Sequence, residues 1–374
     1  MNNIHDLYKN CKGKRVLVRF DGNIPEEVVE RGEKGISLLR LERARDTIHK
    51  LSEAGARVIL MTHLGDDGAR STETLIPLFE LYNIYPSFYG SFDEGLKEVV
   101  NNLEDGEVLL LQNVRTLTGE TTNDPAVVDL YTSLGEVFVN EAFSVSHRDH
   151  ASVSGIAKKL PAYLGEGMVL ELHTIDSFIM SDETLGVIIG GDKLSTKLPL
   201  VKGFLENPLL QFLMLGGALA HPYYESLGYS IGDSLTDKNI KLADIPHDTR
   251  MFAPELVRTN LATDHAVSVK EIRAGEMIWD ADPKTLEVVL VERFKNVEKI
   301  FWNGQLGKGD SIATHMLVKL LMNLDKKVVM GGGDTLVFLS DEIVNHKNIF
   351  VSTGGGALLD YLGTGTLVGI EGLR

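Results

Sequence analysis

Three glycine runs with polar neighbours occupy the second half of the 374-residue sequence, each directly after a strand-like apolar stretch. They cover residues 190–193, 331–335 and 352–356. A strand that ends in glycines and opens a helix leaves backbone N–H groups free to hold phosphate. Three such turns at the carboxyl ends of parallel strands predict a nucleotide site in this half of the chain.

Side chains that could hold an anion follow strand-like runs in the first half. The basic side chains are Arg40, His63, Arg115 and Arg148, and Asp21 and Asn23 add hydrogen-bonding groups for a substrate hydroxyl. Guanidinium forks bind phosphate and carboxylate in a bidentate way. Each arginine taken alone also fits a surface residue or an ion-pair partner. Together, and beside a nucleotide site, they favour phosphoryl transfer.

Two lysines follow the first glycine run. Lys193 and Lys197 have i, i+4 spacing, so one helix face presents both. Lysine is a mobile point charge suited to a phosphoryl group in transfer, although a solvated helix face would show the same spacing. The sequence contains neither a Walker-type phosphate loop nor the signatures of protein kinases.

Polar residues near the later glycine runs could complete the nucleotide site. Asp334 directly follows three glycines and could hold a magnesium ion that bridges nucleotide phosphates, or it could cap the following helix. Asn303 and Asp310 flank a glycine-containing loop and could contact adenine or ribose.

The elements that must position these side chains alternate between strand and helix. Strands are expected at 15–20, 57–61, 107–111, 136–139, 185–189, 210–215, 277–279, 300–302, 327–330 and 348–351. A helix is expected over 38–51, and another over 166–180 that joins the two halves. This alternation is typical of doubly wound α/β sheets.

Composition narrows the class of protein. A formal charge of −16 disfavours nucleic acid as a partner and requires any anion site to gather its cations locally. The one cysteine, Cys11, excludes an intrachain disulfide and fits a reducing compartment. No apolar run approaches the roughly 18 residues of a membrane span, and residues 1–10 lack a signal-peptide core. We therefore expect a cytoplasmic protein with no membrane partner.

Nine segments in order resemble the phosphoglycerate kinase family, from one end of the chain to the other. They are residues 16–23, 61–65, 110–115, 139–148, 190–197, 280–285 and 302–304, followed by the glycine runs at Gly331 and Gly354. The resemblance implies an α/β fold of two doubly wound parallel-sheet lobes joined by a hinge helix. Closure of the hinge would bring the phosphates together and expel water.

The resemblance also implies a division of labour and a monomer. Residues 1–170, with a tail at about 360–374 packing back on them, would bind 3-phosphoglycerate or 1,3-bisphosphoglycerate. Residues 171–359, including the linking helix, would bind ATP or ADP with Mg²⁺. Phosphate would pass directly and in line between the two substrates, so catalysis would come from positioning and charge neutralisation.

Site residues follow by position from the resemblance. The acid substrate would contact Asp21, Asn23, Arg40, His63, Arg115 and Arg148. The nucleotide would contact Gly191, Lys193, Lys197, Asn303, Asp310, Gly332, Gly333, Asp334 and Thr335, with Asp334 at the magnesium. Gly354 and Gly355 would stabilise anionic charge, and Arg40, Lys193 and Lys197 would be catalytic.

Several positions depart from the family pattern, and three of them bear most on activity. Asp66 stands where an arginine is usual, Gly22 replaces a phenylalanine and is expected to loosen its loop, and Asp192 replaces a small neutral residue. A carboxylate about 6 Å from an anionic ligand costs roughly 3 kcal/mol at an effective dielectric of about 20. These departures leave two alternatives open: a catalytically weakened, nucleotide-binding paralogue, and a kinase that acts on a different small acid.

Overall fold

The computed structural model describes residues 3–31, 35–192, 194–343 and 345–373. The chain separates into two compact units, which are described one at a time. Unit 1 comprises Met1–Thr174 with Thr364–Arg374, and unit 2 comprises Ile175–Gly363.

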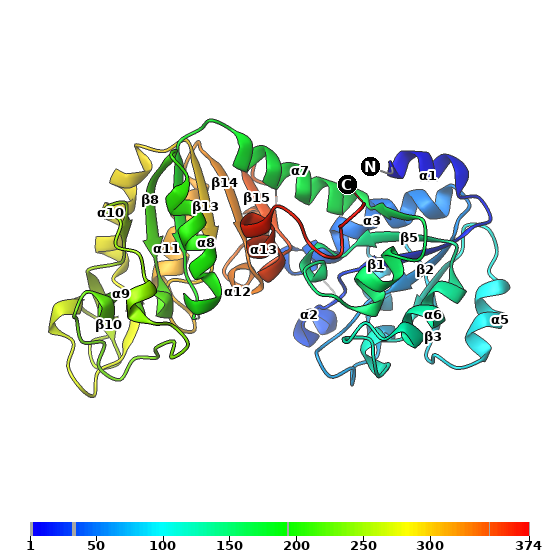
Figure 1. Cartoon of the computed structure of the whole chain (residues 1–374), viewed down its shortest axis with the longest axis horizontal. Helices are drawn as coiled ribbons and strands as arrows, with labels where there is room; N and C mark the ends of the chain where they lie inside the picture. The colour runs from blue at the N-terminus through cyan, green and yellow to red at the C-terminus, as the bar shows by residue number, and fades with distance from the viewer. Residues whose placement is uncertain (1–2, 32–34, 193, 344, 374) are drawn as a thin grey trace. The chain divides into compact units, whose positions relative to one another are not determined.

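Unit 1 is built on a six-stranded parallel sheet (Figure 1). Its strands are β1 Arg15–Phe20, β2 Arg57–Met61, β3 Ser87–Tyr89, β4 Val108–Leu111, β5 Val137–Glu141 and β6 Ala162–Leu164. Its α-helices are α1 Ile4–Asn10, α2 Glu26–Arg31, α3 Leu39–Glu53, α4 Ile76–Glu80, α5 Gly95–Asn101, α6 Pro125–Leu134 and the start of α7 Glu166–Met180. Short turns of 3₁₀-helix are η1 Ile36–Leu38, η2 Thr72–Leu75, η3 Val114–Thr116 and η4 Phe143–Val145, and η5 Ala151–Gly155 is a π-helix.

The strand order of this sheet fixes where a ligand would bind. The order is β3-β4-β2-β1-β5-β6, with β1 paired in parallel to both β2 and β5. The chain adds strands on one side of β1 and then returns to the other side with β5. The topological switch point therefore lies between β1 and β5, and ligands of open α/β sheets collect outside the carboxyl ends of strands at such points.

Unit 2 repeats this architecture. Its main sheet contains β7 Leu185–Ile189, β8 Leu210–Leu215, β9 Met251–Phe252, β13 Lys299–Asn303, β14 Lys327–Gly331 and β15 Ile349–Ser352. Its α-helices after α7 are α8 Leu194–Glu206, α9 Ala220–Ser226, α10 Pro283–Phe294, α11 Ile312–Met322, α12 Gly333–Leu336 and α13 Gly356–Thr364. The 3₁₀ turns are η6 Gly217–Leu219, η7 Leu242–Asp244, η8 Val269–Glu271 and η9 Asp341–Ile343.

The second sheet has the order β15-β14-β13-β7-β8-β9, again parallel throughout, so its switch point lies between β7 and β13. The predicted fold class is confirmed: both units are parallel-sheet α/β structures, and α7 runs from one into the other. One strand was assigned to the wrong sheet. The predicted strand at 277–279 is β12 Ile278–Ala281, which pairs antiparallel with β10 Leu256–Thr259 in a separate small sheet that β11 Val267–Ser268 completes.

Burial explains why these strands read as apolar runs in the sequence. Every residue of β7 is buried, as are all but the first residue of β1 and of β2, because helices cover a parallel sheet on both faces. Helix α3 lies against β1 and β2 in unit 1 (Figure 1). Its buried positions include Leu41, Ala44, Ile48 and Leu51, which recur at helical spacing.

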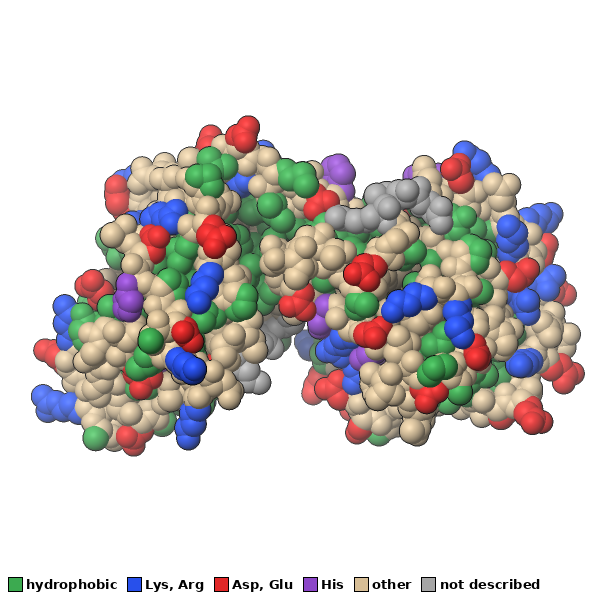
Figure 2. Space-filling view, viewed as in Figure 1, with side chains coloured by type: hydrophobic (Ala, Val, Ile, Leu, Met, Phe, Trp, Pro, Cys, Tyr) green, Lys and Arg blue, Asp and Glu red, His purple; other side chains and the backbone are tan. Residues whose placement is uncertain are grey.

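The end of the chain, drawn in red in Figure 1, belongs to unit 1. Gly369 N donates to Ser146 O at 2.8 Å, and Asn140 Nδ2 donates to Gly369 O at 2.9 Å. Acidic and basic side chains are interspersed over the face shown in Figure 2. Within the described part of the chain, no helix is long and apolar enough to cross a membrane.

Candidate active site

Asp21 stands at the switch point of unit 1, directly after β1. Its carboxylate lies 3.1 Å from Arg40 Nε and accepts hydrogen bonds from Ser144 Oγ, which follows β5, and from Asn23 N at 3.1 Å. Burial works to raise the pKa of Asp21, but the Arg40 charge and the Ser144 hydroxyl together hold it below its ordinary value. Asp21 is thus an ionised anchor for Arg40, which extends from α3.

Asn23 and Arg40 are held by the same loop. Arg40 Nη1 donates to Asn23 O at 2.9 Å, and Asn23 Oδ1 accepts from Gly65 N at 2.9 Å. The loop after β1 is therefore tied to the loop after β2. This arrangement brings the predicted residues Asp21, Asn23 and Arg40 into one hydrogen-bonded group.

His63 follows β2 and is buried, with 3% of its surface exposed. Its Nδ1 lies 3.1 Å from Nη2 of Arg19, a buried arginine on β1. Burial and the charges of Arg19, Arg115 and Arg148 lower the pKa of His63 to about 2, against an opposing effect of Asp21. The ring is therefore neutral in the physiological range although it lies among cations.

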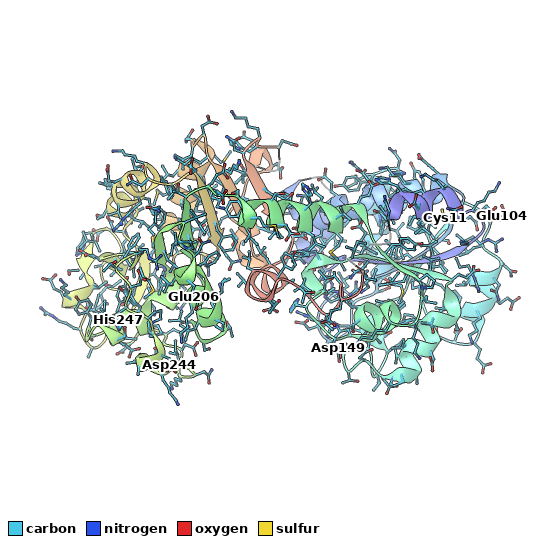
Figure 3. All side chains as sticks on the ribbon, turned by 45° about the horizontal axis from the view of Figure 1, so that its top comes forward. Cys11, Glu104, Asp149, Glu206, Asp244 and His247 are labelled. Atoms are coloured by element: carbon cyan, nitrogen blue, oxygen red, sulfur yellow. The ribbon has the colours of Figure 1, made fainter. Side chains whose placement is uncertain are left out.

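Arg115 and Arg148 follow β4 and β5. Their charges lower the pKa of His63, and they also lower that of His150 to about 4, after the larger effect of burial. Asp149, labelled in Figure 3, marks the segment that carries Arg148 and accepts from Asn123 Nδ2 at 2.9 Å. A cluster of positive charge thus forms in unit 1 after several strand ends, which suits an anionic ligand.

Asp66, the acidic departure from the family pattern, contacts this cluster directly. Its Oδ1 lies 2.6 Å from Arg115 Nη1, and the same nitrogen donates to Asp66 O at 2.9 Å. Arg70 lies close in sequence but donates to Ile24 O at 3.1 Å. The carboxylate therefore forms an ion pair with one of the arginines assigned to the acid substrate.

Gly22 differs from the expectation of a loosened loop. Gly22 N donates to Thr62 Oγ1 at 2.7 Å, so the backbone is tied to the strand end of β2. A Cβ atom at Gly22 would lie 2.8 Å from Thr62 Oγ1 and 3.0 Å from Leu75 Cδ1. The backbone approaches Thr62 so closely that only glycine fits without a shift of its neighbours. The hydrogen bond to Thr62 holds the loop that carries Asp21 and Asn23.

The switch point of unit 2 is bridged by a lysine. Lys197 Nζ donates to Gly190 O, after β7, at 2.7 Å and to Asn303 Oδ1, the last residue of β13, at 3.0 Å. Asn303 Nδ2 in turn donates to Gly331 O of β14 at 2.6 Å. Both ends of the Asn303 amide therefore bond within the protein, and this side chain positions Lys197.

Glycine turns surround that lysine. Gly191 and Gly332 have φ angles of +109° and +118°, which glycine adopts without strain. Thr335 Oγ1 accepts from Gly304 N at 3.0 Å and donates to Gly331 O at 3.1 Å. Gly354 N bonds to Ser352 Oγ at 3.2 Å, and Gly355 immediately precedes α13.

Some predicted nucleotide residues lie outside what the structure describes. They are Lys193 and the side chain of Asp334. Among the described residues, no group of three or more His, Cys, Asp and Glu could hold a metal ion by itself. A magnesium ion held by one carboxylate and by nucleotide phosphates needs no such group.

A cavity of about 370 Å³ opens beside the first glycine turn of unit 2. Its lining includes Gly191, Asp192, Trp279, Leu306 and Lys308, and Lys308 Nζ lies 4.9 Å from the centre of the Trp279 ring. A largely apolar cavity with an aromatic wall suits a flat heterocycle. Asp310 does not line this cavity; it bonds to His315 Nε2 at 2.6 Å and borders a second cavity of about 380 Å³.

Sequence reasoning missed three features of these sites. Arg19 and Ser144 contact the predicted residues His63 and Asp21, and Trp279 lines the 370 Å³ cavity of unit 2. The one available signal was Arg19 itself, since an arginine inside a buried strand must have a partner. Ser144 and Trp279 carry no such signal, because their roles depend on contacts with distant segments.

Comparison with known proteins agrees with this geometry. The sequence model of the family described as phosphoglycerate kinase matches residues 4–364. The chain is 32% identical over 399 residues to the phosphoglycerate kinase of Sphingopyxis alaskensis, covering 97% of this chain and 96% of that one. It is 34% identical over 390 residues to that of Caulobacter vibrioides, covering 97% of each.

Solved structures give the same result. Phosphoglycerate kinase from Coxiella burnetii superposes with a TM-score of 0.75 at 27% identity, covering 97% of this chain and 96% of the other. The enzyme from Pyrococcus horikoshii OT3 superposes with a TM-score of 0.84 at 23% identity, covering 100% and 98%, and at that identity the likeness shows the fold. The chain belongs to the phosphoglycerate kinase family.

Proposed function

We propose that this protein transfers phosphate between ATP and the carboxylate of 3-phosphoglycerate, and in reverse from 1,3-bisphosphoglycerate to ADP. The observation that carries the proposal is the cationic cluster of unit 1, in which Arg19 contacts His63 and the charges of Arg115 and Arg148 act on the same ring. A small acid that bears a phosphate and a carboxylate needs several fixed donors of this kind. Family membership supplies the identity of the acid.

On the acid side, Arg40 is the residue that meets the reacting carboxylate. Its anchor Asp21 and its bond to Asn23 O fix the guanidinium before substrate arrives, so little reorganisation is required in the transition state. His63, Arg115 and Arg148 bind the rest of the substrate. Asn23 and Asp21 orient the substrate by hydrogen bonds to its hydroxyl group.

On the nucleotide side, the 370 Å³ cavity takes the nucleoside and the glycine turns take the phosphates. Gly191 follows β7, and Gly332 and Gly333 lie between the end of β14 and the start of α12, where a turn between strand and helix suits a phosphate. Thr335 lies in the first turn of α12, and the N–H groups of Gly191 and Thr335 bond to Gln305 O and Gly332 O. Lys197 and Lys193 neutralise the group in transfer, and Asn303 holds Lys197 in place. Gly354 and Gly355 stabilise developing negative charge, and Asp310 contacts the ribose from the border of the second cavity.

Asp334 would hold magnesium together with the nucleotide phosphates. When bound, the ion neutralises charge on the β- and γ-phosphate oxygens. Transfer is direct and in line, without a covalent enzyme intermediate. We propose further that the protein acts as a monomer in the cytoplasm, where its single cysteine, Cys11, stays reduced.

Steady-state phosphorylation of 3-phosphoglycerate by ATP and magnesium, coupled to NADH consumption, tests the proposal. Robust turnover that Arg40→Ala lowers by about 10²–10³-fold would support it, since that is the usual loss when one preorganised charge donor is removed. A folded protein that binds ATP but gives no turnover with 3-phosphoglycerate would contradict it. Turnover with another small acid in a substrate panel would replace the acid and keep the kinase.

A further inference from the structure

Arg19 is an unusual residue for the middle of a parallel sheet. It lies on β1 with 1% of its surface exposed, and its guanidinium contacts several groups at once. Nη1 donates to Phe20 O and to Thr62 Oγ1 at 3.3 Å, Nε donates to Ser152 Oγ at 3.1 Å, and Nη2 lies 3.1 Å from His63 Nδ1. A buried guanidinium in so many bonds has one orientation.

The contact with His63 fixes where the ring carries its proton. A guanidinium has donors and no acceptor, and it stays protonated in proteins. His63 Nδ1 must therefore accept from Arg19, which excludes a proton on that nitrogen. In a neutral imidazole one nitrogen is a donor and the other an acceptor, so the proton is on Nε2.

A second pair of residues holds the guanidinium in place. Ser152 Oγ accepts from Arg19 Nε and donates its own proton to Glu120 Oε1, while Ser152 N donates to Glu120 Oε2 at 3.2 Å. All three side chains are buried. Ser152 belongs to the π-helix η5, a backbone form that recurs at functional sites.

The charges around His63 keep the ring neutral. Arg19 on β1, Arg115 on η3 and Arg148 after β5 add to burial in lowering its pKa, while Asp21 after β1 acts in the opposite direction. Without Arg19, His63 would lose the charge that lowers its pKa most, and its Nδ1 would lose its hydrogen-bond partner. The ring could then take up a proton in acid and could also exchange its two neutral forms.

We propose that Arg19, held by Ser152 and Glu120, is a positioning residue that keeps His63 as a neutral Nε2–H donor toward the acid substrate. The role of the substrate rests on the proposed function, whereas the state of the ring does not. The acid site then holds its ligand with fixed guanidinium charges and one histidine donor that does not titrate between about pH 5 and pH 8, where histidine ordinarily changes charge.

Long-range ¹H–¹⁵N correlation spectra of the full ¹⁵N-labelled chain test this directly. The ring signals of His63 are assigned by their loss in His63→Gln. We expect one neutral form, with Nε2 protonated and Nδ1 bare, across that pH range. A wild-type His63 that carries its proton on Nδ1, or that becomes charged near pH 6, would overturn the proposal.

Two variants weaken the hydrogen-bonded chain from Glu120 through Ser152 and Arg19 to His63, and a third variant serves as control. In Arg19→Met the pKa of His63 should rise toward its ordinary 6.5, and signals of both neutral forms should mix. Ser152→Ala keeps Arg19 but loosens it and should shift His63 in the same direction by less, which keeps the test valid if Arg19→Met does not fold. Arg15→Met changes another arginine of β1, whose side chain bonds to Asn101 and Glu136, and should leave His63 unchanged.

Kinetics add a readout that a purely structural role would not move. In Arg19→Met, KM for 3-phosphoglycerate should rise about tenfold at pH 8, the lower end of the loss for one hydrogen bond to a charged group. The variant's penalty should shrink toward pH 5.5 as His63 gains a proton, and Arg19→Lys should recover part of the loss. Absence of any turnover would remove this readout and the proposed function together, while the spectra would still decide the state of His63. Unchanged His63 spectra in both Arg19→Met and Ser152→Ala would overturn the proposal.

Discussion

Asp66 Oδ1 lies 2.6 Å from Nη1 of Arg115, so an exposed carboxylate is paired with a nearly buried guanidinium. The side chain of Asp66 is 90% exposed, and that of Arg115 is 8% exposed. An anionic substrate would need the same guanidinium. Under the proposed function, Asp66 is therefore an internal competitor for Arg115, one of the cations proposed to bind the acid substrate.

Replacing Asp66 with asparagine should strengthen substrate binding. The Asp66→Asn variant keeps the backbone acceptor for Arg115 and removes the competing charge. KM for 3-phosphoglycerate should fall about fivefold, since an exposed charge pair contributes at most about 1 kcal/mol. The value of kcat should hold, because Asp66 has no part in the transfer step.

The neighbouring Asp67 provides a matched control for that experiment. Asp67→Asn makes the same charge change on a side chain that accepts from Ala69 N. It should leave KM close to wild type. The benefit of Asp66→Asn should also shrink as salt is raised, because exposed charges are screened. An equal effect of the two variants would refute a specific competition for Arg115.

Glu141 predicts a pH dependence of stability. Its carboxylate is buried at the start of α7, where it accepts from Thr47 Oγ1, from Gly167 N at 3.1 Å and from Met168 N at 2.9 Å. Burial outweighs these bonds and raises the pKa of Glu141 from 4.5 to about 7. The folded state therefore binds a proton more tightly than the unfolded chain does.

The contribution of Glu141 to the free energy of unfolding is therefore fully present below pH 4.5, and it is lost as the pH rises to about 7. At about 1.36 kcal/mol per pKa unit, wild type should lose roughly 3 kcal/mol over that window relative to Glu141→Gln. Urea unfolding followed by circular dichroism measures it. Exposed Glu104, labelled in Figure 3, gives the control Glu104→Gln, which should show no such window. A constant difference between wild type and Glu141→Gln would contradict the prediction.

The fold was largely predictable, and the reason is burial. Strands such as β1, β2, β7 and β8 are covered on both faces, so their apolar runs reveal them with almost exact bounds. The three-residue strands β3 and β6 are too short to show any period. The segment at 277–279 has strand composition, but its sheet depends on pairing with β10, which no local pattern encodes.

The grouping of the candidate site residues was predictable where they belong to sequence motifs, and it was unpredictable where a contact depends on tertiary pairing. Asp21, Asn23 and Arg40 were identified together and do bond together. The pairing of Asp66 with Arg115 could not be deduced, because 49 residues separate them. Arg19 was not assigned to the site because it lies inside an apolar run, which indicates a buried strand and gives no sign of which residues the arginine contacts.

Trp279 should report nucleoside binding. It is 40% exposed and lines the 370 Å³ cavity, whereas Trp302, the other tryptophan, is fully buried with its Nε1 bonded to Gly304 O. ADP and adenosine should both change the emission of Trp279, because a base in the cavity would contact its ring. Pyrophosphate alone should not. Trp279→Phe should abolish the response; a response that survives in this variant would place the nucleoside elsewhere.

Lys197 and Asn303 should act as one unit in phosphoryl transfer. Lys197→Ala should lower kcat by at least about 10²-fold, the usual effect of removing a preorganised charge from developing negative charge. Asn303→Ala should lower kcat about tenfold, because Lys197 keeps its bond to Gly190 O but loses its second anchor at Asn303 Oδ1. The same assay of the double variant should give the rate of Lys197→Ala alone, since a positioning residue has nothing left to position. Lys202→Ala, an exposed lysine of the same helix, should be neutral. Losses that simply multiply in the double variant would mean that Asn303 acts on the nucleotide independently of Lys197.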